Sequence, residues 1–192
     1  LEALHLYRGR EIIKTVRPEA FEKDALSKKI RVSWEGARIR GRARRATWDG
    51  LIKLTGNRIL TAKTFAFDSP ADGITHQDQQ KIAFKSSTTG DTDGIELVLE
   101  ERAAGLLAFE SAMGACTVSL EELEKNPETF DFGGLGLKVT VQRYPETLQT
   151  MELSLECTVT PEADKTDPFF IKAIQEDGHM AWSSPVYIKT VS

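Results

Sequence analysis

Guanidinium groups gather in one short stretch of this sequence. The stretch holds five arginines within eight residues: Arg38, Arg40, Arg42, Arg44 and Arg45. Each guanidinium can form two parallel hydrogen bonds to a carboxylate or a phosphate. Because side chains alternate between the two faces of a strand, a regular strand would place the first four arginines on one face. We therefore predict a docking face for an anionic partner.

Three kinds of neighbour fit this face. The favoured one is a solvated sheet surface whose charges meet acids on neighbouring strands. The next is a surface that binds an acidic face of another domain, and the third is one that binds nucleic acid. Residues 28–58 carry ten Lys and Arg against two acids, a local charge of +8, so the rest of the chain carries −12 to reach the total of −4. That negative balance, and the absence of aromatic residues between the arginines, make nucleic acid the least favoured of the three.

The residues that usually build catalytic and metal sites are scattered. His5, His76 and His179 lie far apart, and the sequence has no Cys-x-x-Cys, His-x-His or Glu-x-x-His spacing. The run 91–94 begins like a calcium loop, but Arg102 stands where the distal glutamate is required, so a turn is favoured. We predict no catalytic residue, no bound metal and no cofactor.

Tryptophan and cysteine side chains carry two weaker expectations. Trp48 and Trp182 are candidates for stacking on a ligand, although tryptophans on sandwich strands more often belong to the core. Cys116 and Cys157 fall in alternating runs, where buried thiols are favoured over a disulfide or a reactive pair. Reduced cysteines slightly favour a cytoplasmic location.

Alternation of apolar and polar residues is the commonest pattern in the chain, and it predicts β-strands. The clearest runs are 29–34, 137–141 and 151–159. Further strands are predicted over 11–16, 37–48, 51–55, 59–67, 81–86, 95–100, 106–111, 116–120, 169–176 and 181–190. Asp177 and Gly178 are typical of the tight turn of a hairpin. Roughly a dozen strands at such short spacing predict an antiparallel β-sandwich.

The predicted exceptions to the strands are short. Residues 120–127 have the acidic first turn and the terminal proline of a short helix. The glycine-rich stretch 129–136 is predicted to be a loop. No linker, repeat or run of about 20 apolar residues interrupts the chain, so we predict a single all-β domain over 1–192 and no membrane span. Because the sequence begins with Leu1 and runs directly into a strand pattern, we expect a piece of a larger protein.

Four segments, taken in order, resemble the C-terminal β-rich part of large uncharacterised bacterial proteins related to the PHP-type metal-dependent phosphoesterases. They are 44–50 (RRATWDG), 88–94 (TTGDTDG), 130–135 (FDFGGL) and 175–185 (QEDGHMAWSSP). The last segment is the most specific, and together the four span most of the chain. The resemblance implies that the histidine- and acid-rich metal site belongs to a preceding catalytic domain, whose motifs this chain lacks.

These observations predict a non-catalytic accessory β-sandwich domain of a larger PHP-like hydrolase. Such a domain would pack beside the catalytic domain or mediate assembly, with the arginines as its docking surface. The alternative is an independent module that binds a glycan or a polyanion, as sandwich domains often do. Hydrolysis by the chain itself is disfavoured, because its sequence has no cluster of histidines, cysteines or paired acids. The oligomeric state stays open.

Overall fold

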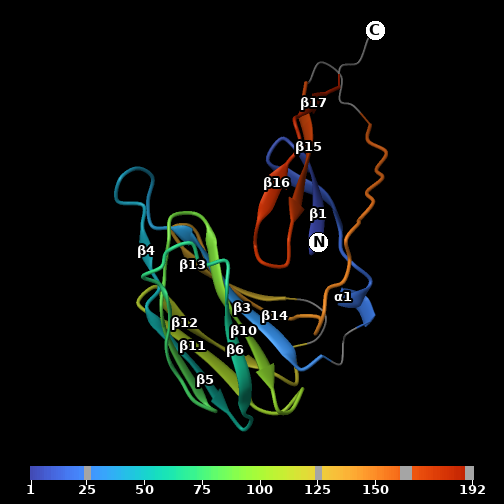
Figure 1. Cartoon of the computed structure of the whole chain (residues 1–192). Coiled ribbons are helices and arrows are strands. Elements are labelled where there is room, and N and C mark those ends of the chain that lie inside the picture. The colour runs from blue at the N-terminus through green and yellow to red at the C-terminus, as the bar shows by residue number, and fades with distance from the viewer. Residues whose placement is uncertain (24–26, 124–126, 161–165, 189–192) are drawn as a thin grey trace. The chain divides into compact units, whose positions relative to one another are not determined.

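The computed structural model describes residues 1–23, 27–123, 127–160 and 166–188 (Figure 1). Antiparallel β-sheets dominate these ranges, and their one helix, α1 (Ala20–Lys23), is too short to cross a membrane. The predicted all-β, sandwich-like fold is confirmed. The chain divides into two compact units: unit 1 comprises Leu1–Glu22 and Thr147–Ser192, and unit 2 comprises Lys23–Glu146. The single domain expected over 1–192 stays a prediction.

Unit 2 contains two five-stranded sheets and one two-stranded ribbon. The spatial order of the first sheet is β13 (Glu128–Gly133), β14 (Leu135–Arg143), β3 (Lys29–Ala37), β10 (Thr92–Leu99) and β6 (Ile59–Phe65). The order of the second sheet is β12 (Gly114–Ser119), β11 (Leu106–Ser111), β5 (Gly50–Thr55), β8 (Lys81–Lys85) and β7 (Gly73–Gln77). The ribbon pairs β4 (Ala46–Thr47) with β9 (Ser87–Thr88).

The core of unit 2 lies between its two five-stranded sheets. Along β3, Ile30, Val32 and Trp34 are fully buried, as the alternation of this strand predicts. The indole of Trp34 lies with its centroid 4.5 Å from that of Phe84 on β8 and 5.5 Å from that of Phe109 on β11. Burial of an aliphatic or phenyl side chain contributes about 1.5–3 kcal/mol. This cluster therefore joins the first sheet to the second.

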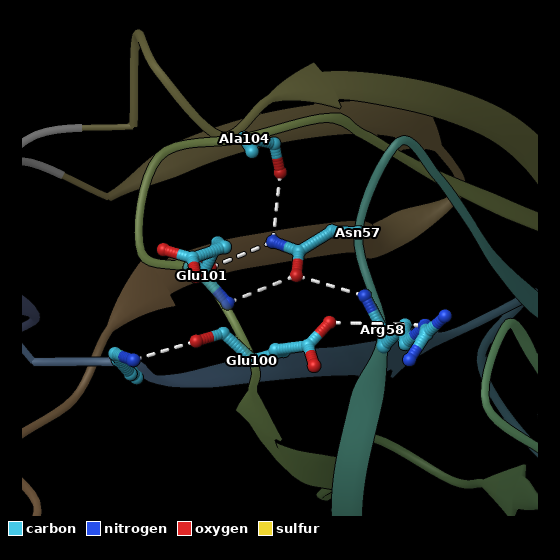
Figure 2. Close-up of polar contacts among 6 residues, drawn as sticks. Asn57, Arg58, Glu100, Glu101 and Ala104 are labelled. Atoms are coloured by element: carbon cyan, nitrogen blue, oxygen red, sulfur yellow. Dashed lines mark hydrogen bonds and ion pairs between the residues drawn. The ribbon is translucent and has the colours of Figure 1, made fainter.

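Asn57 ties two connections of unit 2 together (Figure 2). Its Nδ2 donates to the carbonyl oxygens of Glu101 at 2.7 Å and Ala104 at 2.8 Å. Its Oδ1 accepts from the backbone N–H groups of Arg58 at 2.8 Å and Glu101 at 3.0 Å. Beside it, Arg58 Nε lies 3.7 Å from a carboxylate oxygen of Glu100 (Figure 2). The amide of Asn57 thus fixes the β5–β6 turn against the β10–β11 connection.

The helix predicted over 120–127 is wrong for the part of it that the structure describes. The chain makes a turn there, in which Leu123 N donates to Ser119 O at 3.0 Å, and residues 124–126 lie outside the described ranges. The Leu123 carbonyl accepts a hydrogen bond from the buried guanidinium of Arg143 at 3.0 Å. A side chain from β14 therefore satisfies a carbonyl that a longer helix would have paired internally.

Unit 1 is a single five-stranded sheet. Its spatial order is β16 (Met180–Trp182), β15 (Pro168–Ile174), β1 (Ala3–Arg8) and β2 (Glu11–Val16), and β17 (Val186–Tyr187) also pairs with β15. The predicted hairpin at Asp177 and Gly178 is confirmed, because β15 pairs with β16 and Gly178 turns with φ +90°. Pro185 lies between β16 and β17, where it removes no ladder hydrogen bond.

Two further stretches differ from their predicted structure. Residues 129–136 do not form a loop but the greater part of β13, the turn and the start of β14, and the turn uses Gly133 and Gly134 at φ +79° and +58°. Their glycines supply the turn that joins the two strands. Residues 151–159 form no strand, because their backbone pairs with no described strand despite the clear alternation. Alternation defines two faces, but a strand also needs a neighbour.

Candidate docking surface at the arginine loop

Residues 38–45, which we name the arginine loop, connect β3 to β4 and contain all five arginines of the predicted docking face. Arg38 N donates to Arg44 O at 2.9 Å, so the chain turns back on itself. Gly41 lies within this turn at φ +93°, a conformation that favours glycine. The loop extends past the ends of its neighbouring strands (Figure 1). The single strand predicted over 37–48 is therefore wrong, and the arginines lie around a loop and not on one strand face.

The guanidiniums of the arginine loop face solvent. All five arginines are exposed, and Ile39 between them is 53% exposed. Among residues 1–23, 27–123, 127–160 and 166–188, no acid forms an ion pair with any of the five. The solvated-sheet alternative required acids on neighbouring strands to neutralise these charges. In the described ranges that neutralisation is absent, and the loop concentrates positive charge.

A buried hydrogen-bond chain anchors both ends of the arginine loop. Trp48, which follows the loop, is fully buried and donates from Nε1 to Thr88 Oγ1 at 2.8 Å. Thr88 Oγ1 donates in turn to the carbonyl of Gly36, which precedes the loop, at 2.7 Å. Gly36 has φ +104°, and a Cβ there would lie 2.3 Å from the carbonyl oxygen of Gly136. Only glycine fits that approach, so the entry to the loop is closely defined.

A second buried chain lies beside the first. Trp34 donates from Nε1 to Ser86 Oγ at 2.7 Å, and Ser86 Oγ donates to Asp93 Oδ2 at 2.5 Å. Asp93 is 1% exposed, and its Oδ1 is the one buried side-chain polar atom of the described residues that has no hydrogen-bond partner. Burial raises the pKa of Asp93 to about 7, despite the opposing hydrogen bond from Ser86. A neutral carboxyl group under the loop is therefore accessible near neutral pH.

Two carboxylates near the β4–β9 ribbon accept hydrogen bonds from residues at or just before the start of β9. Asp49 Oδ1 accepts from the backbone N–H of Ser86 at 3.1 Å. Asp72 Oδ2 accepts from both the backbone N–H and the hydroxyl of Ser87, at 3.1 and 3.3 Å. These acids bind backbone and hydroxyl donors of the ribbon and do not pair with the arginine loop.

Three of the four segments that carry the family resemblance meet at this place. The ribbon pairs segment 44–50 with segment 88–94 through Ala46 and Thr88. Segment 130–135 reaches the same indole, because the ring of Phe132 lies 6.4 Å from that of Trp48 between centroids. The fourth segment, 175–185, belongs to the β15–β16 hairpin of unit 1. The motifs of unit 2 therefore build the base of the arginine loop.

The two tryptophans predicted as stacking candidates have different environments. Trp48 is fully buried and bound to Thr88, so it lies in the core, the position favoured for it, and is not accessible to a stacked ligand. Trp182 on β16 is 58% exposed, and the ammonium of Lys172 lies 5.6 Å from its ring centroid. Tyr187 on β17 is 59% exposed. Only Trp182 of the two candidates presents a ring to solvent.

Histidine and cysteine side chains lie apart from one another. His76 on β7 pairs with Asp78, and His179 pairs with Asp177 in the turn between β15 and β16; all four side chains are exposed. In the described part of the chain no three His, Cys, Asp or Glu residues are placed to hold a metal ion. Both cysteines are free, and burial raises the pKa of half-buried Cys116 to about 11. Cys157 is exposed, so its predicted burial is wrong.

Comparisons of the chain with family models, with curated proteins and with solved structures find no match. The arrangement around the arginine loop therefore has to be interpreted from its own geometry.

The buried carboxyl of Asp93 was missed by the sequence analysis, although the sequence held a signal for it. On β10 the side chains of Asp93, Ile95, Leu97 and Leu99 share one face, and all four are buried. Extending the alternation of the predicted strand 95–100 by one step would have placed Asp93 inside. Its Ser86 partner had no such signal, because the two residues meet only through the fold.

Proposed function

We propose that this chain is a non-catalytic accessory module of a larger protein, and that its arginine loop docks on an acidic surface of a catalytic domain in the same polypeptide. The observation that carries the proposal is the arginine loop itself. Five exposed guanidiniums stand on a closed turn and have no ion pair with a described acid. The resemblance to the C-terminal part of PHP-related phosphoesterases supports a metal-dependent hydrolase domain as the partner.

Two properties of the arginine loop favour docking: its ends are already fixed, and its positive charges are clustered. The hydrogen bonds of Thr88 with Trp48 and Gly36 hold both ends of the loop, so docking has to order the arginine side chains but not the loop ends. Clustered positive charge speeds association with an acidic patch and aligns the partners. Because exposed charges are screened over about 8 Å at physiological ionic strength, affinity should fall as salt rises.

A binding measurement tests the docking role. The chain and the separately produced upstream domain are titrated by calorimetry at low and at physiological salt. The variant Arg40→Gln/Arg42→Gln is compared with Lys63→Gln/Lys85→Gln, which removes the same charge from exposed lysines of unit 2. We expect about a tenfold or greater loss of affinity for the arginine pair and less than about twofold for the lysine pair.

Two results would contradict the docking role. Equal losses in the two variants would mean that net charge acts without a specific site. No binding of the unaltered chain at micromolar concentration in low salt would remove the proposal altogether. Both variants change exposed residues, so their denaturation midpoints should match that of the unaltered chain and report correct folding.

A glycan-binding module is the second candidate function, favoured by the exposed rings of Trp182 and Tyr187. Both residues lie on strands that pair with β15, opposite Lys172 and Pro168 respectively, so their side chains share one face of the sheet. The apolar face of a sugar ring stacks on such rings while its hydroxyls reach a neighbouring cation.

Tryptophan fluorescence tests this second candidate. Since Trp34 and Trp48 are fully buried, acrylamide should quench chiefly Trp182, and an acidic oligosaccharide should protect it. The variant Trp182→Leu should abolish the response, and Trp48→Phe should keep it. Quenching that no oligosaccharide alters would eliminate this function without touching the docking proposal.

A further inference from the structure

Residues 151–159, which we name the strap, have the sequence of a strand and lack the pairing of one. Their odd-numbered positions are Met, Leu, Leu, Cys and Val, and their even-numbered positions are Glu, Ser, Glu and Thr. All four even-numbered side chains are exposed, whereas Leu153, Leu155 and Val159 are half-buried. No backbone hydrogen bond joins the strap to the rest of the described backbone. Met151 and Cys157 are exposed as well, so Leu153, Leu155 and Val159 alone distinguish an inner from an outer face.

Strand β2 lacks a described neighbour on one side. It stands at the end of the unit 1 sheet and pairs with β1 alone among the described strands. Its outer edge consequently presents backbone N–H and C=O groups that can accept another strand. An exposed edge of this kind is a site for β-augmentation or for aggregation unless the protein covers it. Unit 1 thus holds both an edge with which no described strand pairs and a segment with strand periodicity.

Two contacts hold the strap beside the N-terminal strands of unit 1 and give its direction. The amino group of Leu1 donates to the carbonyl of Thr150 at 2.6 Å, and the ammonium of Lys14 donates to the carbonyl of Glu156. Lys14 is the register partner of Leu6. From Thr150 to Glu156 the chain advances six residues, and from Leu1 to Leu6 it advances five. Nearly equal advances are what two extended chains lying side by side would show. The strap runs parallel to β1 and antiparallel to β2.

The same contacts agree on a register. Residue numbers of antiparallel partners add to a constant, which the Lys14 and Glu156 contact sets at 170. The β1–β2 pairing ends at Leu4 and Val16; continued by three residues, it would carry Leu1 to position 19, and the Leu1 contact with Thr150 then gives 169. The two contacts are therefore compatible with one register to within one residue. A strap placed at random along the sheet would have no reason to give the same register twice.

We propose that residues 151–159 close on the free edge of β2 as an antiparallel strand, with Glu156 beside Lys14 and Cys157 beside Ile13. Closure pairs backbone groups of the strap and covers the edge of β2. The occupant of the edge is this segment of the same chain and not a second copy, because both orienting contacts join the chain to itself. A partner strand could add to β2 only by displacing the strap.

Disulfide trapping with the native Cys157 tests the closure, and Cys116→Ser leaves Cys157 as the only native thiol. In that background, Ile13→Cys should form an intramolecular disulfide on mild oxidation, because cross-strand neighbours lie within the Cα separation that a disulfide requires. Thr15→Cys should react at least about tenfold more slowly, since it is displaced by two positions. Ala181→Cys, exposed on the opposite edge strand β16, should not link to Cys157 within the chain.

The oxidation results separate the possible occupants of the edge. Intramolecular linkage at Ile13→Cys that is independent of protein concentration supports closure by the strap. Linkage that grows with concentration and joins two molecules would overturn it in favour of strand exchange between copies. Equal rates for Ile13→Cys, Thr15→Cys and Ala181→Cys would also overturn it, because they would mean that the strap has no fixed register.

Amide hydrogen exchange of the unaltered chain supplies a readout without cysteine chemistry. In an edge strand alternate amides point toward the neighbouring strand, so every second amide of residues 151–159 should exchange at least about tenfold more slowly than its neighbours. Uniformly fast exchange across the strap would overturn the proposal even if a disulfide forms. Amides of β1, which pairs on both sides, provide the internal reference for protection.

Discussion

Trp48 and Thr88 stand 40 positions apart in sequence and are joined by a hydrogen bond of 2.8 Å from the indole Nε1 to the hydroxyl oxygen. The same hydroxyl donates to the carbonyl of Gly36. Gly36 precedes the arginine loop and Trp48 follows it, so Thr88 closes the base of the loop from a separate strand. The arginine loop is thus held by a residue outside its own sequence.

Thr88→Val should destabilise unit 2 by about 1–3 kcal/mol, because it leaves the buried indole N–H of Trp48 without an acceptor. The carbonyl of Gly36 keeps its hydrogen bond from Gly90 N at 3.1 Å, which limits the loss. Thr88→Ser retains the hydroxyl and serves as the matched control, with a loss of less than about 1 kcal/mol. Denaturant unfolding measures both variants. Equal losses would mean that the methyl group, and not the hydrogen bond, is what matters at this position.

Asp93 should make the stability of unit 2 fall as pH rises. Burial raises the pKa of Asp93 to about 7, against about 3.9 in an unfolded chain. The folded state therefore binds the proton more tightly, and this contribution is complete below about pH 4 and lost as pH rises to about 7. Asp93→Asn carries no titrating proton. Relative to the unaltered protein it should gain about 3 kcal/mol between pH 5 and pH 8.

Chemical denaturation of both proteins at several pH values measures this difference. Glu121→Gln, which removes an exposed carboxylate in the turn after β12, is the control and should follow the unaltered protein. A constant difference between Asp93→Asn and the unaltered protein across the range would mean that Asp93 is ionised throughout.

Asn57→Ala should destabilise unit 2 by about 1–3 kcal/mol, since three hydrogen bonds between two connections and one within the β5–β6 turn are lost. Asn57→Asp keeps the acceptor but turns a carboxylate oxygen toward the carbonyls of Glu101 and Ala104. It should therefore be at least as unstable as Asn57→Ala at pH 7 and should recover as pH falls below about 4, where the carboxyl gains a proton. Thermal unfolding at the two pH values decides the matter. An Asn57→Asp protein as stable at pH 7 as the unaltered one would contradict the donor role of Nδ2.

The two cysteines should differ strongly in reactivity. Cys157 is exposed, and Cys116 is half-buried with a pKa raised to about 11 by burial. At pH 8 about one Cys116 thiol in a thousand is ionised, and only the thiolate reacts quickly. A maleimide reagent followed by mass spectrometry should therefore label Cys157 first and Cys116 only slowly until the protein is denatured. Labelling of both at one rate would mean that β12 opens readily.

The outline of the fold could be predicted from alternation alone. Residues 29–34 alternate because one face of β3 meets the core, and the structure buries Ile30, Val32 and Trp34 as that pattern requires. The turn at Asp177 and Gly178 could likewise be predicted from adjacent residues, since the turn needs a positive φ and glycine adopts it readily. Such features depend only on residues adjacent in the chain.

The sequence predicted which residues form the candidate docking surface but not their arrangement. The five arginines and their excess charge are visible in the sequence, but their alternation predicted one strand face where the chain forms a loop. A strand requires a neighbour with free backbone groups, and no described strand pairs with residues 38–45. For Trp48 the sequence favoured a core position and left ligand stacking open, because its burial depends on Thr88 and Phe132 from distant strands.

The sequence by itself determined an all-β chain, the strand phases of its core and the concentration of positive charge in residues 38–45. The tertiary structure alone decided that these arginines stand on a loop, that Asp93 is buried against Ser86, and that the strap carries no strand pairing in the described structure. The physical reason is the range of the interactions. Periodicity and turn chemistry act between near neighbours, whereas hydrogen-bond partners and burial are set by segments that meet only when the chain folds.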